Sequence, residues 1–221
     1  FILSALFSRS AKDDPELASL IKAGLTGEDV ENALYVLSTV RFASLDAWPE
    51  QMEFLFHKDA ATRRRARSIL GGTGLPTRRV VADRLTAILD DPQRKGDHAD
   101  AVRALGVLSR PAGSMFGQRE NWPADEARKR FNDRFVDIVR EGPPELVAPA
   151  LVAMGTDTLE KFDTYSKMVD QSDESAEFKE RIKQARDKIE AEAERVDDRP
   201  KPIDPQEPDS REVGGSGGGI F

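Results

Sequence analysis

Apolar residues recur in this chain at spacings of three and four, and one such pattern returns four times. Each copy is a stripe of three apolar residues at positions i, i+3 and i+4. The stripes are Leu17, Leu20 and Ile21; Met52, Leu55 and Phe56; Leu85, Ile88 and Leu89; and Phe135, Ile138 and Val139. Their middle residues are 35, 33 and 50 positions apart. Because this spacing places apolar side chains on one face of an α-helix, the chain is predicted to be all-α.

A second motif alternates with these stripes. It consists of a small residue, a large aliphatic residue and another apolar residue three positions later. Its aliphatic residues are Leu34, Ile69, Leu105 and Leu151, which are 35, 36 and 46 positions apart. The chain is therefore predicted to alternate a first helix, a turn and a second helix four times. A single helix pair buries too little apolar surface to be stable alone, so we expect the pairs to stack around a shared core.

The second helices also share a recognisable sequence. In "DAATRRRARSILG", Asp59 lies in the turn, Thr62-Arg63 opens the helix and Leu70-Gly71 ends it. The stretch "DAVRALGVL" repeats this element with Val102-Arg103. The pattern resembles HEAT repeats, which pair two antiparallel helices over ~40 residues. The resemblance covers residues 15–156 and implies a short right-handed α-solenoid of about four antiparallel helix pairs.

The fourth unit and the residues after it depart from the repeat. The stretch "EGPPELVAPALVAMG" lacks an arginine after the turn and places Pro149 inside the expected helix. Residues 157–196 are predicted to form further helices, the last with a heptad-like seam. The seam consists of Phe178, Ile182, Ala185, Ile189 and Val196, with Glu192 in the gap. It suits either a C-terminal capping helix or a short dimeric coiled coil, and its Ala and Glu residues favour the cap.

The two ends of the chain differ from the repeats in composition. Residues 1–14 begin with the apolar run Phe1–Phe7 and continue with Arg9 and Lys12. The run is apolar on all sides, which favours the end of a truncated membrane anchor over the first helix of the fold. Residues 197–221 are rich in Pro, Gly and charge, and we expect this tail to be disordered.

The residue types that carry most enzyme chemistry are scarce. The chain contains no cysteine, and its two histidines, His57 and His98, lack metal-binding spacing. It has no GxSxG nucleophile motif, no P-loop and no GxGxxG sequence. We therefore expect a non-enzymatic protein with no cofactor, no metal and no small-molecule substrate. A formal net charge of −7 also argues against a protein coated with nucleic acid.

The most basic stretch of the chain runs from Asp59 to Leu85 and contains seven arginines. Helix geometry divides them between the second helix of one unit and the first helix of the next. Second helices tend to line the concave side of HEAT-type arrays, and four arginines on them are expected to point away from the core. They are Arg64, Arg67, Arg103 and Arg110. We predict that they form a short concave basic strip, suited to an acidic peptide or a few phosphates.

A structural role is the favoured alternative for these arginines. Arginine is a good helix former on solvent-exposed faces, and neighbouring aspartates can pair with it. The aspartates in question are Asp59, Asp83, Asp97 and Asp100. In HEAT repeats the arginine that corresponds to Arg63 and Arg103 commonly bonds a turn aspartate. The resemblance therefore implies a structural role for these two above all.

A long insertion, residues 110–126, stretches the last interval of the repeat. It contains Met115, Phe116 and Trp122, which are residue types that anchor protein interfaces. Loops of this length in compact domains often have a function. The alternative, which fits the sequence equally well, is that Phe116 and Trp122 fold back onto the helices.

The leading functional hypothesis is a helical-repeat scaffold that binds a protein partner through its concave face and the 110–126 loop. Nucleic-acid binding or DNA repair is the first alternative, because some DNA glycosylases use a HEAT-like solenoid with a basic groove. A pI of 5.1 and the lack of a stacking aromatic beside the arginines argue against it. A lyase-like chaperone, as in bilin-attachment proteins with such repeats, is a third hypothesis without specific support. The sequence fits a cytoplasmic protein and a membrane-tethered soluble domain alike.

Overall fold

The computed structural model describes residues 14–111 and 121–196, and all regular elements within these ranges are helical. In chain order they are α2 (Pro15–Thr26), α3 (Val30–Val40), η1 (Pro49–Phe56), α4 (Ala60–Gly71), α5 (Leu75–Asp90), η2 (Pro92–Asp97), α6 (His98–Ser109), α7 (Ala124–Ala127), η3 (Arg128–Asn132), α8 (Asp133–Glu141), α9 (Pro144–Ala153), α10 (Leu159–Gln171) and α11 (Ala176–Val196). The π-turn η3 joins α7 to α8 without a break. The all-α prediction is confirmed for this part of the chain.

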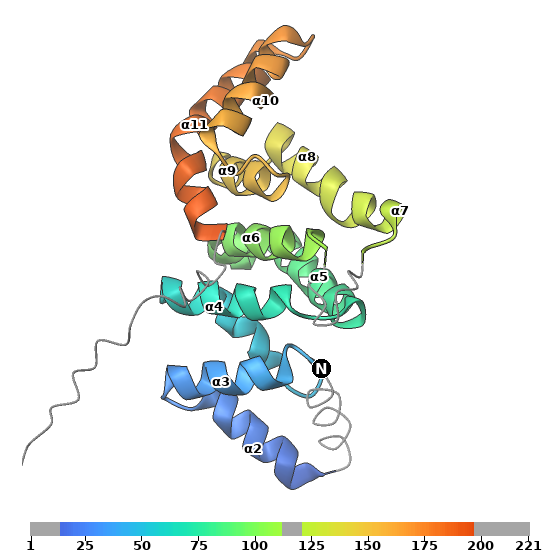
Figure 1. Ribbon diagram of the computed structural model, residues 1–221, viewed down its shortest axis with the longest axis vertical. Helices are drawn as coiled ribbons and strands as arrows, with labels where there is room; N and C mark the ends of the chain where they lie inside the picture. The colour runs from blue at the N-terminus through green and yellow to red at the C-terminus, as the bar shows by residue number, and fades with distance from the viewer. Residues whose placement is uncertain (1–13, 112–120, 197–221) are drawn as a thin grey trace, which may run out of the picture.

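The helices succeed one another along the long axis of the molecule (Figure 1). Helices α3, α4, α6, α9 and α11 form a row in which each contacts the next. Each member of this row also contacts a helix that precedes it in the sequence. The pairs are α3 with α2, α4 with η1, α6 with α5, α9 with α8, and α11 with α10. The second sequence motif falls on the row, and the i, i+3, i+4 stripes fall on the elements beside it.

Aspartates determine where three of the helices begin. Asp14 and Asp29 each accept two backbone N–H bonds from the first turns of α2 and α3, at 3.0–3.2 Å. Asp59 accepts from the backbone N–H and the hydroxyl of Thr62 at 2.7 and 2.8 Å. These bonds satisfy N–H groups that a helix start leaves without an intrahelical partner. The bonds from Thr62 also lower the pKa of Asp59 below its usual value.

Three of the four aliphatic residues of the second motif lie in the hydrophobic core, whereas Ile69 is partly buried and packs against it. Those at most 2% exposed are Leu34, Leu105 and Leu151. The predicted stripe of the first helix is wrong at Leu20, which is 71% exposed. The buried stripe of α2 runs instead through Ile21 and Leu25, because α3 and η1 pack on that face.

Helix α9 is enclosed by other helices, since it contacts α6, α8 and α11. Every residue from Leu146 to Val152 is buried, including the proline within the helix, Pro149. The close approach of α6 to α9 depends on Gly106, where an added Cβ atom would lie 2.8 Å from the Cβ of Ala153. The unit that departs most from the repeat pattern in sequence is therefore fully integrated into the core.

Helix α11 runs from α10 back along the row toward α6 (Figure 1). Its seam packs against α9 and α10. The seam residues that are at most 9% exposed are Phe178, Ile182, Ala185 and Ile189. Because the same chain covers this seam, it is not available for the dimeric coiled coil that the sequence left open. Glu192, in the gap of the seam, is also buried.

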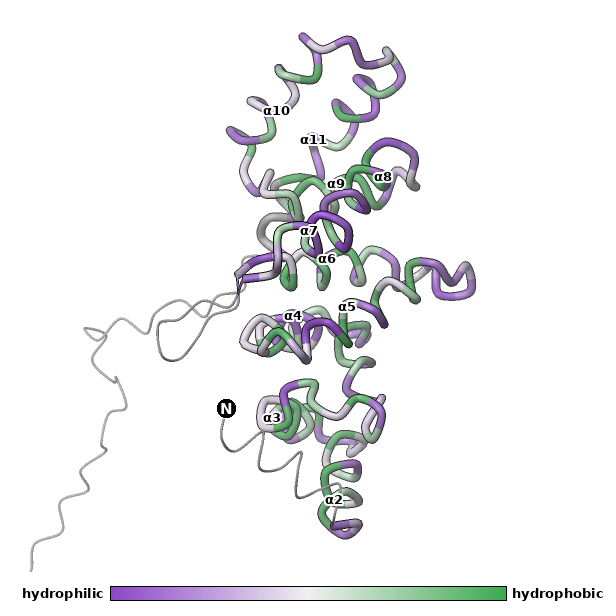
Figure 2. The backbone as a smooth tube through the Cα atoms, turned by 90° about the vertical axis from the view of Figure 1, so that its right-hand side faces the viewer, coloured by the Kyte–Doolittle hydropathy of each residue, from purple (hydrophilic) through white to green (hydrophobic). Residues whose placement is uncertain are grey.

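Hydropathy alternates along most helices, as expected where each helix has one buried face (Figure 2). Within the two described ranges, no helix is both long and apolar enough to cross a bilayer. The expected anchor segment Phe1–Phe7 and the tail 197–221 lie outside the described residues.

Candidate functional site

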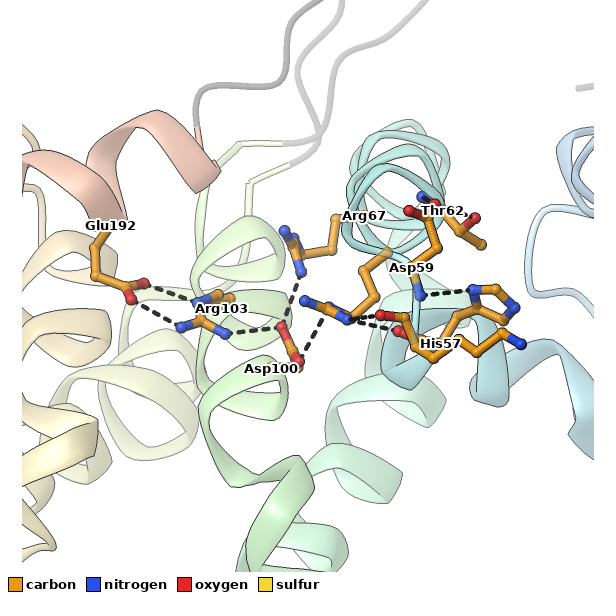
Figure 3. A network of polar contacts seen from close by, with 9 residues as sticks. His57, Asp59, Thr62, Arg67, Asp100, Arg103 and Glu192 are labelled. Carbon is orange, nitrogen blue, oxygen red and sulfur yellow. Dashed lines mark hydrogen bonds and ion pairs between the residues drawn. The ribbon is translucent and has the colours of Figure 1, made fainter.

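Asp100, on the first turn of α6, bonds three arginines from two helices. Arg63 and Arg67 reach its carboxylate from α4 at 3.2 Å each, and Arg103 reaches it from within α6 at 2.8 Å. Figure 3 shows Asp100 between Arg67 and Arg103. These four residues and Glu192 are called the arginine cluster below.

Glu192 brings the C-terminal helix into the arginine cluster. Its two carboxylate oxygens accept from Nε and Nη2 of Arg103, both at 2.8 Å, in the paired geometry that makes such bonds strong. Arg103 is 8% exposed and Glu192 is 5% exposed. Burial lowers the pKa of Arg103, but the hydrogen bonds and charges of Glu192 and Asp100 outweigh that effect, so its pKa is raised. Arg103 therefore remains a guanidinium cation although it is buried.

Arg63 also forms hydrogen bonds to the turn that precedes its own helix, α4. Its Nη1 donates to the carbonyl oxygens of His57 and Lys58, at 2.6 and 3.0 Å, where η1 ends. A cation is favourable there because the last carbonyls of a helix lack intrahelical donors. The resemblance to HEAT repeats implied that Arg63 and Arg103 bond a turn aspartate, and both bond Asp100. The arginine cluster thus joins η1, α4, α6 and α11.

The predicted concave strip is wrong as an exposed surface at two of its four positions. Arg67 is 4% exposed and Arg103 is 8% exposed. The prediction considered each helix alone, whereas α6 packs beside α4 in the row and Glu192 of α11 covers Arg103. Arg64 is exposed and Arg110 is half-buried.

Arg78, from the same basic stretch, is a buried arginine at the ends of two helices. It is 1% exposed. Its guanidinium donates to the carbonyl oxygens of Gly71 at 2.6 Å, Thr73 at 3.0 Å, Leu108 at 3.1 Å and Arg110 at 2.6 Å. These carbonyls lie where α4 and α6 end, so one cation stabilises both helix C-termini. The sequence placed Arg78 away from the strip but did not predict its burial.

Other arginines of the basic stretch bond acidic residues on distant elements. These pairs are Arg65 with Glu31 at 2.5 Å, Arg79 with Glu126 at 2.8 Å, and Arg84 with Asp46 at 2.7 Å. Of the aspartates considered as partners, Asp100 bonds three arginines, Asp83 pairs with Arg130 and Asp97 pairs with Arg94. The structural alternative therefore accounts for most of the basic stretch.

Trp122, predicted as an interface anchor, is part of the core. It is 8% exposed, and its Nε1 donates to the carbonyl oxygen of Leu108 at 2.8 Å. Its ring packs edge-on against Phe131, with ring centroids 5.0 Å apart. It folds back because the indole N–H finds an acceptor at the end of α6 and the ring finds an apolar neighbour. Met115 and Phe116 lie outside the described residues, so their role as anchors stays a prediction.

An apolar hollow of about 250 Å³ lies between α8 and α10, where the sequence predicted no site. Its apolar lining residues are Val136, Val139, Met154, Met168, Val169 and Phe178. Six large apolar side chains are exposed in the described chain, and three of them are here. These are Val136 at 36%, Met154 at 40% and Met168 at 65%. We call this hollow the apolar groove, and exposed apolar surface of this kind marks interaction sites.

Arg140 forms one wall of the apolar groove. Its guanidinium bonds the carboxylate of Glu174 and lies over the ring of Phe178, 5.3 Å from the ring centroid. A second hollow of about 560 Å³, between α8, α9 and α11, shares Arg140 and Phe178 with the groove. Tyr165 also lines the groove, and burial raises the pKa of its hydroxyl, which therefore remains neutral.

Two residues of the apolar groove do give a signal in the sequence. Met168 immediately precedes Val169, and Val136 immediately follows Phe135. Each therefore widens the apolar face of its helix beyond the buried stripe. Large apolar residues just outside a stripe on two helices are a sign of an exposed apolar surface.

The described ranges contain no group of three or more His, Asp or Glu side chains suited to hold a metal ion. Comparison with protein-family models, with curated proteins and with solved structures finds no match to this chain.

Proposed function

We propose that this protein is a non-enzymatic helical scaffold whose apolar groove binds a protein partner. The proposed architecture is a short, right-handed, HEAT-like solenoid of about four antiparallel helix pairs, capped by α10 and α11. The row of contacts from α3 to α11 supports it, because each member also contacts an element that precedes it in sequence. Arrays of this kind offer extended surfaces for binding other proteins.

The observation that carries this proposal is the concentration of exposed apolar side chains at the groove. Two of the three are methionines, Met154 and Met168, whose flexible side chains adapt to the shape of a partner. The groove measures about 250 Å³. Small-molecule pockets usually measure ~300–1,000 Å³, so the groove suits inserted side chains of a protein better than a cofactor.

The surfaces predicted from the sequence have less support. An acidic peptide or a nucleic-acid phosphate on the concave strip would have to displace carboxylates that already bond Arg67 and Arg103. Trp122 is buried, which leaves Met115 and Phe116 as the loop residues that still fit an interface role. We therefore centre the proposal on the groove, with the 110–126 loop as an additional contact.

A photo-reactive amino acid tests the proposed function. The full chain with benzoylphenylalanine in place of Met168 is irradiated in an extract of the source cells. The matched control carries the probe in place of Tyr35 on α3, where exposure is 69% against 65% for Met168. We expect a discrete cross-linked protein from position 168 alone, and its loss when Val136→Gln is added. Equal products from both positions, or none from position 168, would contradict the proposal.

A further inference from the structure

Acidic residues surround the apolar groove. Four exposed carboxylates are next in sequence to groove-lining residues, namely Asp137, Glu141, Asp173 and Glu177. None of these four forms an ion pair with another described residue. Two cations are also next in sequence to groove-lining residues. Lys167, next to Met168, is exposed, and Lys179, next to Phe178, donates to the carbonyl oxygens of Asp170 and Ser172. The immediate rim of the groove therefore has an excess of negative charge.

The wider region around the groove is acidic as well. Residues 133–177 contain eleven acidic and four basic residues, a net charge of −7. The whole chain also carries −7, so the remainder of the molecule is neutral in total. Three of the four basic residues pair with Asp90, Glu174 and Asp157. Four of the acidic residues pair with cations outside this range, namely Asp133 with Arg128, Glu145 with Lys95, Asp163 with Arg186 and Asp170 with Lys183. The four carboxylates next to the groove remain outside these pairs. A partner with complementary charge at this surface is cationic.

We infer that the groove binds an amphipathic α-helix of a partner protein, with lysine or arginine residues on both sides of its apolar stripe. This inference rests on the proposed function. The apolar stripe would cover Val136, Met154 and Met168, and the flanking cations would meet the acidic rim.

The form of the groove favours a helix over an extended peptide. Its lining residues recur at i, i+3 and i+4 on α8 (Val136, Val139, Arg140) and on α10 (Tyr165, Met168, Val169), with Ser172 at the end of α10. The ridges of a third helix fit between two such rows. An extended peptide gains affinity by adding to the edge of a sheet, and the described part of the chain contains no strand.

The second hollow brings further carboxylates close to the groove. Glu141, Glu177 and Glu180 line it together with the cations Arg140, Arg181 and Lys188. Arg140 already bonds Glu174, and Arg181 donates to the backbone carbonyl oxygens of Val139 and Ile138. A long basic side chain at one end of the bound helix can reach the glutamates while its apolar neighbours occupy the groove. Nucleic-acid phosphates and anionic lipid headgroups would be repelled by the acidic rim of the groove.

Two designed peptides test the charge and the form of the partner. One is an amphipathic 14-residue helix of Leu and Lys, and the other replaces every Lys with Glu. Each is labelled with fluorescein and titrated with the full chain, and binding is followed by anisotropy. We expect the Leu–Lys peptide to bind with a Kd on the order of micromolar and the Leu–Glu peptide to bind at least about tenfold more weakly. Added salt should weaken binding of the Leu–Lys peptide.

Variants of the protein test whether the Leu–Lys peptide binds at the groove. Met168→Gln makes one lining residue of the groove polar without changing its charge, and it should weaken binding of the Leu–Lys peptide by about tenfold. The double variant Asp137→Lys/Asp173→Lys should weaken it by about five- to tenfold. The matched double variant Glu16→Lys/Glu28→Lys changes two exposed residues, one in the first turn of α2 and one just after it, and should bind as the wild type does.

Several results would overturn this inference. They are equal binding of the two peptides, no binding of the Leu–Lys peptide, binding that is insensitive to Met168→Gln, and a dimer in sedimentation that Met168→Gln dissociates. If any of them occurs while position 168 still cross-links a partner, the scaffold function stands and only the partner chemistry is rejected. If position 168 yields no cross-link, the scaffold function itself is rejected.

Discussion

The arginine cluster between α4 and α6 and the apolar groove between α8 and α10 use their side chains in opposite ways. In the cluster, arginines that look suited to an anionic partner bond Asp100 and Glu192 of the same chain, and Arg67 and Arg103 are at most 8% exposed. At the groove, Met168 is 65% exposed and four neighbouring carboxylates have no ion pair in ranges 14–111 and 121–196. Residue type alone therefore does not mark a binding surface, because an intramolecular partner can already satisfy the chemistry.

Arg78→Ala should give the largest effect on folding. It would leave four carbonyl groups at the ends of α4 and α6 without the donors that now satisfy them. We expect the free energy of unfolding to fall by roughly 4 kcal/mol, measured by urea denaturation. The exposed neighbour Arg65→Ala is the control and should cost less than about 1 kcal/mol. Equal losses for the two variants would contradict the role of Arg78 as a shared helix cap.

Asp100→Ala should be the next most destabilising change. Three arginines bond this carboxylate, and two of them are buried. Removing it leaves like charges close together, and we expect a loss of about 3 kcal/mol in chemical denaturation. Asp97→Ala, whose side chain pairs with Arg94 on the surface, is the comparison, with an expected loss below about 1 kcal/mol. If Asp100→Ala were as mild, the arginine cluster would not organise α4 and α6.

Met168→Gln should leave folding almost unchanged. Its side chain lies at the surface of the groove, so the substitution removes little buried apolar area. We expect a change in the free energy of unfolding within about 0.5 kcal/mol, measured by thermal or urea denaturation. Val169→Gln is a matched change one position later at a residue that is 7% exposed, and it should cost several-fold more. Equal losses at the two positions would show that Met168 is a core residue.

Glu126→Gln should give a small effect that depends on pH. The hydrogen bond from Arg79 lowers the pKa of Glu126 below its usual value. A carboxylate with a lowered folded-state pKa stabilises the fold above its unfolded-state pKa of about 4.3, and this contribution is lost as pH falls through the folded-state value. The wild type should therefore lose more stability than Glu126→Gln between about pH 5 and about pH 3. Parallel urea midpoints for the two proteins over this interval would contradict the shift.

Much of the fold could be predicted because it follows local periodicity. The stripe around Ile88 and the second motif around Leu34 and Leu105 lie on buried faces of α-helices, as the spacing indicated. The stripe around Leu55 is also buried, but it lies on the 3-10 helix η1 and not on the α-helix that the spacing predicted. Leu20 was assigned to the core and is exposed, since the face that a helix buries depends on its neighbours. The sequence of α11 suited a cap or a dimeric coiled coil and favoured the cap, and the seam packs against α9 and α10 of the same chain.

The candidate site was less predictable because it depends on contacts between distant residues. Arg103 and Glu192 are 89 positions apart, and no periodicity in either helix indicates that they meet. The helical position of Arg67 was taken to be outside the core, but a neighbouring helix covers that side. Met154 and Met168 form one surface only when α10 packs beside the end of α9, which helix periodicity does not specify.

Two conservative variants in the two regions test the central claim most directly. Glu192→Gln removes a charge from the arginine cluster, and Met168→Gln replaces an apolar side chain that lines the groove. Both variants are assayed for unfolding in urea and for binding of the Leu–Lys peptide by anisotropy. We predict that Glu192→Gln lowers the free energy of unfolding by about 2 kcal/mol and leaves the peptide affinity unchanged. Met168→Gln should keep the stability and lose about tenfold in affinity. The opposite pattern, or loss of both properties in both variants, would contradict the division between an internally satisfied cluster and an open binding surface.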